Sequence, residues 1–197
     1  ERNQAVRQVH YPTNAQTLRQ ARYRLAFEEL YLIQCGLLLL KKQSQEQRQG
    51  ICHRVNGYLV RQLFQALPFQ LTNDQQKVWQ DICNDMESDV PMRRLLQGDV
   101  GSGKTVVAML ALVKTVENGF QGALMAPTEI LAHQHYEDFC HLLEPLGVRV
   151  ALLSSRLSIG KRRGIYEKLA KHEIDIVIGT HALIQDEVQF AALGLAI

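Results

Sequence analysis

The chain has 197 residues, of which 46% are hydrophobic and 21% are charged, and this composition is typical of a globular protein with one full domain and an appendage. The four cysteines form no C-x-x-C pair, which argues against a zinc site and favours reduced thiols in a cytoplasmic protein. The net charge of +2 is too small to indicate a partner, and the most apolar stretch, residues 30–40, is shorter than the roughly twenty residues of a membrane span.

The N-terminal part of the chain is expected to be helical. Apolar residues recur there at steps of three and four, which predicts one long helix over about 13–42. Thr13 or Asn14 can cap this helix, because both side chains accept hydrogen bonds from the first free N–H groups. The apolar face is broad, so we expect it to pack against a domain.

A polar break at 43–50 is expected to follow, and then a second helix over about 51–65 that ends before Pro68. We therefore assign residues 1–66 to a helical linker segment. Residues 67–197 have a different pattern and are assigned to an α/β domain.

Strands and helices alternate through this second part, which predicts a parallel sheet flanked by helices on both faces. The predicted strands are 95–97, 123–126, 149–153, 174–178 and 193–197. The predicted helices are 73–87, 105–118, 128–143, 159–171 and a short one at 182–184.

Residues 98–105 read GDVGSGKT and match the phosphate-binding P-loop, G-x-x-x-x-G-K-T. The glycines allow the backbone N–H groups to point at phosphates, and the helix that follows adds partial positive charge. As catalytic residues, Lys104 is expected to reach the β- and γ-phosphates and Thr105 to bind the metal Mg²⁺. The expected nucleotide-binding residues of the loop are Gly98, Asp99, Val100, Gly101, Ser102, Gly103, Lys104 and Thr105.

Upstream, the segment LTNDQ at 71–75 resembles the glutamine motif of superfamily 2 helicases. In that interpretation Gln75 also binds the nucleotide, because an amide can donate to and accept from the adenine edge together. An ordinary helix start with Thr72 as its cap explains the same residues equally well.

Two further segments resemble nucleic-acid motifs of helicases. They are APTE at 126–129, similar to motif Ia, and GTHA at 179–182, similar to a motif Ib-type loop. Each follows a predicted strand, at the carboxyl edge where open α/β sheets bind ligands. The expected DNA-binding residues are Pro127, Thr128, Glu129, Gly179, Thr180 and His181.

Longer segments resemble the RecG family of ATP-dependent DNA helicases over essentially the whole chain. They are residues 10–12, 21–30, 85–105, 126–135 and 175–184. The transcription-repair coupling factor shares part of this pattern, but it usually has Tyr where Ser102 stands and Arg where Ala182 stands.

The resemblance implies a RecA-like P-loop domain that uses ATP and Mg²⁺ to translocate on double-stranded DNA. It implies forked and branched DNA as partners, through the remodelling of stalled replication forks and recombination intermediates, and we expect a monomer. In that family the strand at 193–197 leads into an Asp-Glu-x-His motif, which this sequence lacks. We therefore expect a fragment, with linker helices and an incomplete first RecA-like domain of residues 67–197, that binds ligands but does not hydrolyse ATP.

Two other interpretations stay open at this point. One is a fragment of a transcription-repair coupling translocase. The other is a P-loop regulatory nucleotide switch, although the sequence has no Asn-Lys-x-Asp motif of the kind that reads guanine.

Overall fold

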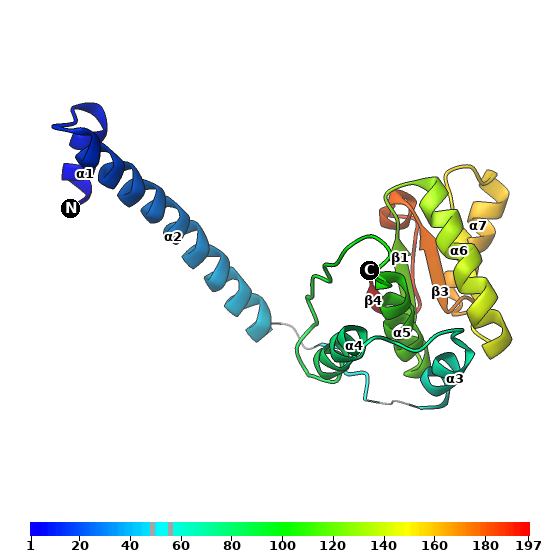
Figure 1. Ribbon diagram of the computed structural model, residues 1–197. Helices are drawn as coiled ribbons and strands as arrows, with labels where there is room; N and C mark the ends of the chain where they lie inside the picture. The colour runs from blue at the N-terminus through cyan, green and yellow to red at the C-terminus, as the bar shows by residue number, and fades with distance from the viewer. Residues whose placement is uncertain (48–49, 55–56) are drawn as a thin grey trace. The chain divides into compact units, whose positions relative to one another are not determined.

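The computed structural model describes residues 1–47, 50–54 and 57–197, and it divides the chain into two compact units, Glu1–Gln49 and Gly50–Ile197 (Figure 1). The first unit consists of α1 (Arg2–His10) and α2 (Ala15–Gln47). The Asn14 side chain accepts a hydrogen bond of 2.9 Å from the Thr17 N–H, so Asn14 caps α2 as predicted.

The first unit differs from the prediction in two respects. Its first helix, α1, is not predicted, because its nine residues are mostly polar and it buries only Ala5. The predicted break is wrong for residues 43–47, which continue α2 and include no Gly or Pro; residues 48 and 49 lie outside the described residues. Within this unit Leu30 and Leu37 are exposed, so packing of the apolar face against a domain stays a prediction.

The second unit contains four parallel strands in the order β2-β3-β1-β4, as predicted for a sheet of alternating strands and helices. They are β1 (Gln121–Met125), β2 (Val150–Leu153), β3 (Ile176–Gly179) and β4 (Leu193–Ala196). Three of them end at the same level, because Gly179 of β3 lies opposite both Met125 and Leu153.

Helices cover both faces of this sheet, and the alternation of strand residues decides which face each side chain joins. On one face Ile176 and Ile178 pack with Leu110 of α5 (Lys104–Glu117) and Phe139 of α6 (Glu129–Leu143). On the other face Val177 packs with residues of α7 (Ile159–Ala170) and of the short helix η2 (His181–Ile184).

The helix predicted over 51–65 is shorter in the structure, where α3 comprises Tyr58–Ala66. Residues 51–54 are not helical, since the His53 N–H donates to the Met86 carbonyl at 2.8 Å; residues 55 and 56 lie outside the described residues. Helix α3 packs on α5 and belongs to the unit Gly50–Ile197, whereas the assignment of residues 1–66 to a linker segment stays a prediction.

Helix α4 (Asn73–Met86) forms as predicted, but the strand predicted over 95–97 is wrong. This segment is extended without sheet pairing, and Leu95 is 87% exposed. A strand needs a hydrogen-bonded neighbour, and this segment has none. In the described part of the chain, no helix combines the length and apolar character needed to cross a membrane.

Candidate functional site

The P-loop turns sharply into the first residue of α5. Gly101 has φ 77° and Gly103, the N-cap of α5, has φ 81°, both in the left-handed region that glycine adopts without steric cost. A Cβ atom at Gly103 would collide with the Gln75 amide nitrogen. The glycines of the motif are therefore required by backbone shape and by the close approach of a neighbouring side chain.

The Lys104 side chain lies inside the curled loop. Its Nζ donates hydrogen bonds to the carbonyl oxygens of Gly98 at 2.8 Å and Asp99 at 2.6 Å. Lys104 and Thr105 are the first two residues of α5, and N–H groups in a first helical turn have no acceptor within the helix. The loop thus brings one cation and a row of N–H donors to one place, which suits a phosphate chain.

Gln75 joins the start of α4 to this loop. Its Oε1 accepts from the Thr72 N–H at 2.9 Å, and its Nε2 donates to the Ser102 carbonyl at 2.9 Å. The Thr72 hydroxyl in turn accepts from the Gln75 N–H, which completes a capping box. The helix cap, which is one of the two interpretations of this segment, is therefore confirmed. The contact of Gln75 with adenine remains a proposal.

A cavity of about 350 Å³ adjoins the P-loop and Gln75. Apolar side chains of Val78, Leu96 and Val107 line it together with the charged Lys104 and Asp74. A mostly apolar wall with a few polar groups is typical of a small-molecule site, and the residues present fit a nucleotide with its phosphates at Lys104. Thr105 would then supply a hydroxyl ligand to Mg²⁺.

The two segments predicted to bind DNA lie side by side at the carboxyl edge of the sheet. Pro127 follows β1 and Thr180 follows β3, and the Ala126 N–H donates to the Gly179 carbonyl at 2.8 Å. The Thr128 hydroxyl accepts from the Leu131 N–H at 3.3 Å and caps α6. The structure thus brings the predicted residues together, with free helix-start N–H groups nearby.

Glu129 belongs to this group in sequence but has an internal partner in the structure. Its carboxylate accepts hydrogen bonds from the Ser154 hydroxyl, from the Ser155 hydroxyl at 2.6 Å and from the Ser155 N–H at 2.9 Å. These bonds lower the pKa of Glu129 to about 2, so the group is anionic at neutral pH. An anionic carboxylate disfavours a direct phosphate contact, and the DNA-binding role of Glu129 stays a prediction.

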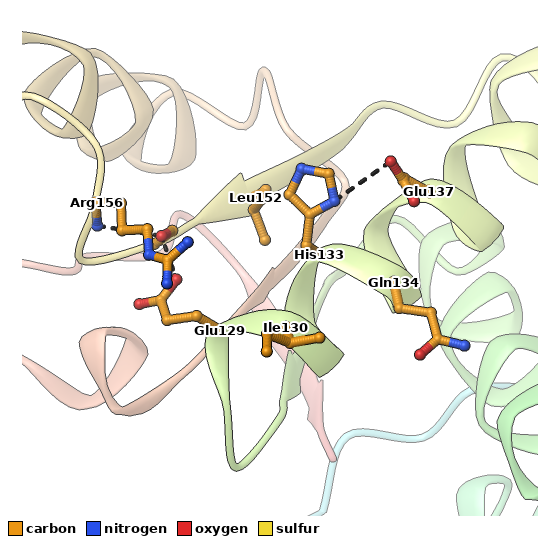
Figure 2. Close-up of a pocket in the computed structure, with 8 residues that line it drawn as sticks. Glu129, Ile130, His133, Gln134, Glu137, Leu152 and Arg156 are labelled. Atoms are coloured by element: carbon orange, nitrogen blue, oxygen red, sulfur yellow. Dashed lines mark hydrogen bonds and ion pairs between the residues drawn. The ribbon is translucent and has the colours of Figure 1, made fainter.

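The contact of Glu129 with the loop of residues 154–158 is not predicted from the sequence. This loop connects β2 to α7 and lies 25 residues from Glu129 in sequence, so no local pattern indicates the contact. A cavity of about 340 Å³ lies beside it, and Figure 2 shows Arg156 and Glu129 at one end of the residues that line it. At the other end His133 pairs with Glu137 at 3.3 Å.

Comparison with known proteins bears directly on this arrangement. The profile of the DEAD/DEAH box helicase family matches residues 72–197. The ATP-dependent DNA helicase RecG of Bacillus subtilis (strain 168) is 48% identical over 194 residues, which are 98% of this chain and 28% of that protein. RecG of Thermotoga maritima is 46% identical over 189 residues, or 96% of this chain and 24% of its own length.

A solved structure of RecG bound to a three-way DNA junction matches this fold with a TM-score of 0.86 and 45% identity. The match covers 98% of this chain and 26% of that chain. The resemblance to RecG and the RecA-like fold class are thereby confirmed. The chain spans less than a third of the length of these relatives.

Proposed function

Because the chain belongs to the DEAD/DEAH box helicase family, we propose that it forms the nucleotide-binding part of an ATP-dependent DNA helicase of the RecG type. The activity would be ATP-driven translocation on double-stranded DNA that remodels stalled forks and branched recombination intermediates. Support comes from the related structure, which is described as bound to a three-way DNA junction. The relatives reported above bear the RecG name, which favours this activity over that of a coupling translocase or a regulatory switch.

The observation that carries the proposal is the Lys104 amino group enclosed by the carbonyls of the P-loop. Once bound, ATP with Mg²⁺ supplies the phosphoryl group for transfer to water. Lys104 would exchange its carbonyl partners for phosphate oxygens, and Thr105 would hold the metal ion. Gln75 would present its remaining amide donor and acceptor to the adenine edge.

For DNA, the proposed contacts are the N–H groups and short side chains of residues 127–128 and 179–181. Phosphate contacts of this kind position a duplex without reading its sequence, as a translocase requires. We further propose that the 197 residues bind ATP and DNA without rapid hydrolysis, because they include neither an Asp-Glu-x-His motif nor an arginine from a second motor domain. We also propose that the protein is cytoplasmic.

The DNA part of this proposal is tested by fluorescence anisotropy with a labelled three-way junction titrated with the chain. We expect saturable binding that weakens with salt and is reduced several-fold by His181→Ala. His141→Ala is the matched control, because His141 lies in the last turn of α6, away from Thr128 at its start. A chain that binds no DNA at low salt, or equal loss in both variants, would contradict the proposed interface.

A further inference from the structure

Residues 50–54 are the first described residues of the second unit, and they lie along the end of α4. The Gly50 N–H donates to the Asp89 carbonyl at 2.7 Å, and the His53 N–H donates to the Met86 carbonyl at 2.8 Å. A Cβ atom at Gly50 would collide with the backbone that follows Asp89. Backbone contacts therefore fix the segment through which the chain enters the second unit.

The His53 side chain anchors this segment in a closely packed site. It is 3% exposed, and its ring meets the Phe120 ring edge-on, with 5.4 Å between the ring centroids. A Cβ atom at Gly194 of β4 would lie 3.0 Å from the His53 Nε2, so the glycine leaves room for the ring. Within residues 1–47, 50–54 and 57–197, neither ring nitrogen has a hydrogen-bond partner of good geometry. The imidazole is therefore packed as an apolar group.

The surroundings of His53 favour its neutral form. Burial is the main cause that lowers the pKa of His53, and the charge of the nearby Lys114 also lowers it. The carbonyls of Ile51 and Met86 oppose this shift only in part. Protonation would place a second cation near Lys114, which is fully buried on α5 and pairs with Glu87 at 2.7 Å. The other ionisable groups on the surrounding elements are Cys52, Arg54, Cys83, Asp89 and Glu117, and neither β4 nor the turn that bears Phe120 has one.

The cluster of His53, Lys114 and Glu87 lies at the far ends of α4 and α5 from the proposed nucleotide site. Helix α4 has Gln75 in its first turn and Glu87 directly after its last residue. Helix α5 begins with Lys104 and has Lys114 in its last turn. The two helices are thus joined at both ends, by the bond of Gln75 to the P-loop and by the buried ion pair. Packed helices act as rigid elements, so a shift at the His53 end reaches the ends that bear the site.

We propose that His53 is a positioning residue for the nucleotide site, because its neutral ring docks residues 50–54 against the far ends of α4 and α5 and thereby keeps Gln75 aligned with the P-loop. Removing the ring, or giving it a charge, releases the segment and lowers nucleotide affinity. The inference rests on the proposed function, because it takes residues 98–105 as the nucleotide site. It makes the entry of the chain into the second unit a point at which ATP binding is controlled.

The first test measures the affinity for a fluorescent ATP analogue at about pH 7.5 and about pH 5 in the parent chain, in His53→Phe and in the exposed control His141→Phe. A phenyl ring keeps the contact with Phe120 but cannot gain a proton. The folded-state pKa of His53 lies below its ordinary value of 6.5, so docking is complete above 6.5 and is lost as the pH falls towards the folded value. The parent and His141→Phe should therefore lose about two- to tenfold more affinity in acid than His53→Phe. Titration of the nucleotide itself affects all three chains alike.

The second test separates positioning from a general loss of stability. His53→Ala leaves a cavity beside Phe120 and should lower nucleotide affinity about two- to tenfold at about pH 7.5, whereas His53→Phe should bind like the parent. Leu169→Ala is the matched control, because Leu169 is fully buried on the other face of the sheet. It should lower the melting temperature and leave the affinity unchanged. Thermal unfolding measures the stability of each variant, and affinities are compared where all of them are folded.

The outcomes distinguish this inference from the function on which it rests. A parent chain that binds no nucleotide contradicts both. A parent chain that binds, with His53→Ala matching its affinity, contradicts only the role of His53. An equal loss in Leu169→Ala attributes the effect to stability and also contradicts positioning. If His53→Ala does not fold, the first test still decides, because equal acid losses in the parent and in His53→Phe would refute the proposal.

Discussion

The side-chain amide of Gln75 donates a hydrogen bond of 2.9 Å to the carbonyl oxygen of Ser102, which lies 27 residues further along the chain. The same amide accepts from the Thr72 N–H, so one side chain joins the first turn of α4 to the P-loop. The proposed nucleotide site therefore combines two segments, and a residue outside the P-loop motif is hydrogen-bonded to the loop.

Gln75→Ala should lower the affinity for all nucleotides, and it should lower the affinity for ATP most. Loss of the bond to Ser102 loosens the P-loop, which should cost GTP and inorganic triphosphate about two- to tenfold in affinity. Loss of the proposed adenine contact should lower ATP affinity further. Titrations with the three ligands measure both effects, with Gln80→Ala on the exposed side of α4 as the control. Unchanged GTP affinity would refute the role of the Ser102 bond, and equal losses would refute adenine reading.

Gly103→Ala should damage both stability and nucleotide binding. A left-handed backbone costs a non-glycine residue about 1–2 kcal/mol, and the new methyl group would collide with the Gln75 amide. Thermal unfolding and nucleotide titration measure the two effects. Gly160→Ala is the control, because a Cβ atom there meets nothing within 4 Å, and it should cost no stability. Equal melting temperatures for the two variants would show that the conformation of Gly103 is not required.

Gln121→Met should destabilise the second unit without altering the nucleotide site. This fully buried amide donates to the carbonyls of Leu169 and Ile174 and accepts from the Ala192 N–H. An apolar replacement leaves buried backbone groups without this partner, at a cost of about 2–4 kcal/mol. Urea unfolding should show that loss, whereas the exposed Gln189→Met should unfold like the parent. A large change in ATP affinity at saturating folded protein would contradict a purely structural role.

Acidic pH should remove the stabilisation that comes from the hydrogen bonds of Glu129 with Ser154 and Ser155. The folded-state pKa of Glu129, about 2, lies below its ordinary value of 4.5. The stabilisation is therefore complete above the ordinary pKa and is lost as the pH falls towards the folded value. Urea unfolding should thus show a difference in stability between the parent and Glu129→Gln that is larger at about pH 7 than at about pH 3. A difference that is the same at both pH values would mean that the hydrogen bonds to Ser154 and Ser155 do not form in solution.

Sequence patterns were sufficient where local residues determine the structure. Thr128 caps α6, the glycines shape the P-loop, and the apolar runs form β1 to β4, because each of these features depends on neighbouring residues. The two proposed DNA segments could also be placed at one edge, since parallel strands align their carboxyl ends.

Patterns failed where the decisive partner is distant in sequence. Residues 51–54 have helix-compatible composition, but the His53 N–H is used by the Met86 carbonyl. The α3 start is set by Glu117, which accepts from the Gly57 and Leu59 N–H groups. The 95–97 segment resembles a strand in its apolar residues but has no hydrogen-bonded neighbour in the sheet. For the same reason the contact of Glu129 with the loop after β2 has no signal in local sequence.

The central claim is that residues 98–105 form a nucleotide site with Lys104 as its phosphate ligand. The most direct measurement is titration of a fluorescent ATP analogue with Mg²⁺ into the parent chain and into Lys104→Ala, with the exposed Lys171→Ala as the control. Loss of a charge-assisted contact of about 1.5–3 kcal/mol should lower affinity by about one to two orders of magnitude in Lys104→Ala alone, with unchanged thermal unfolding. Equal affinity of Lys104→Ala and the parent chain would contradict the assignment.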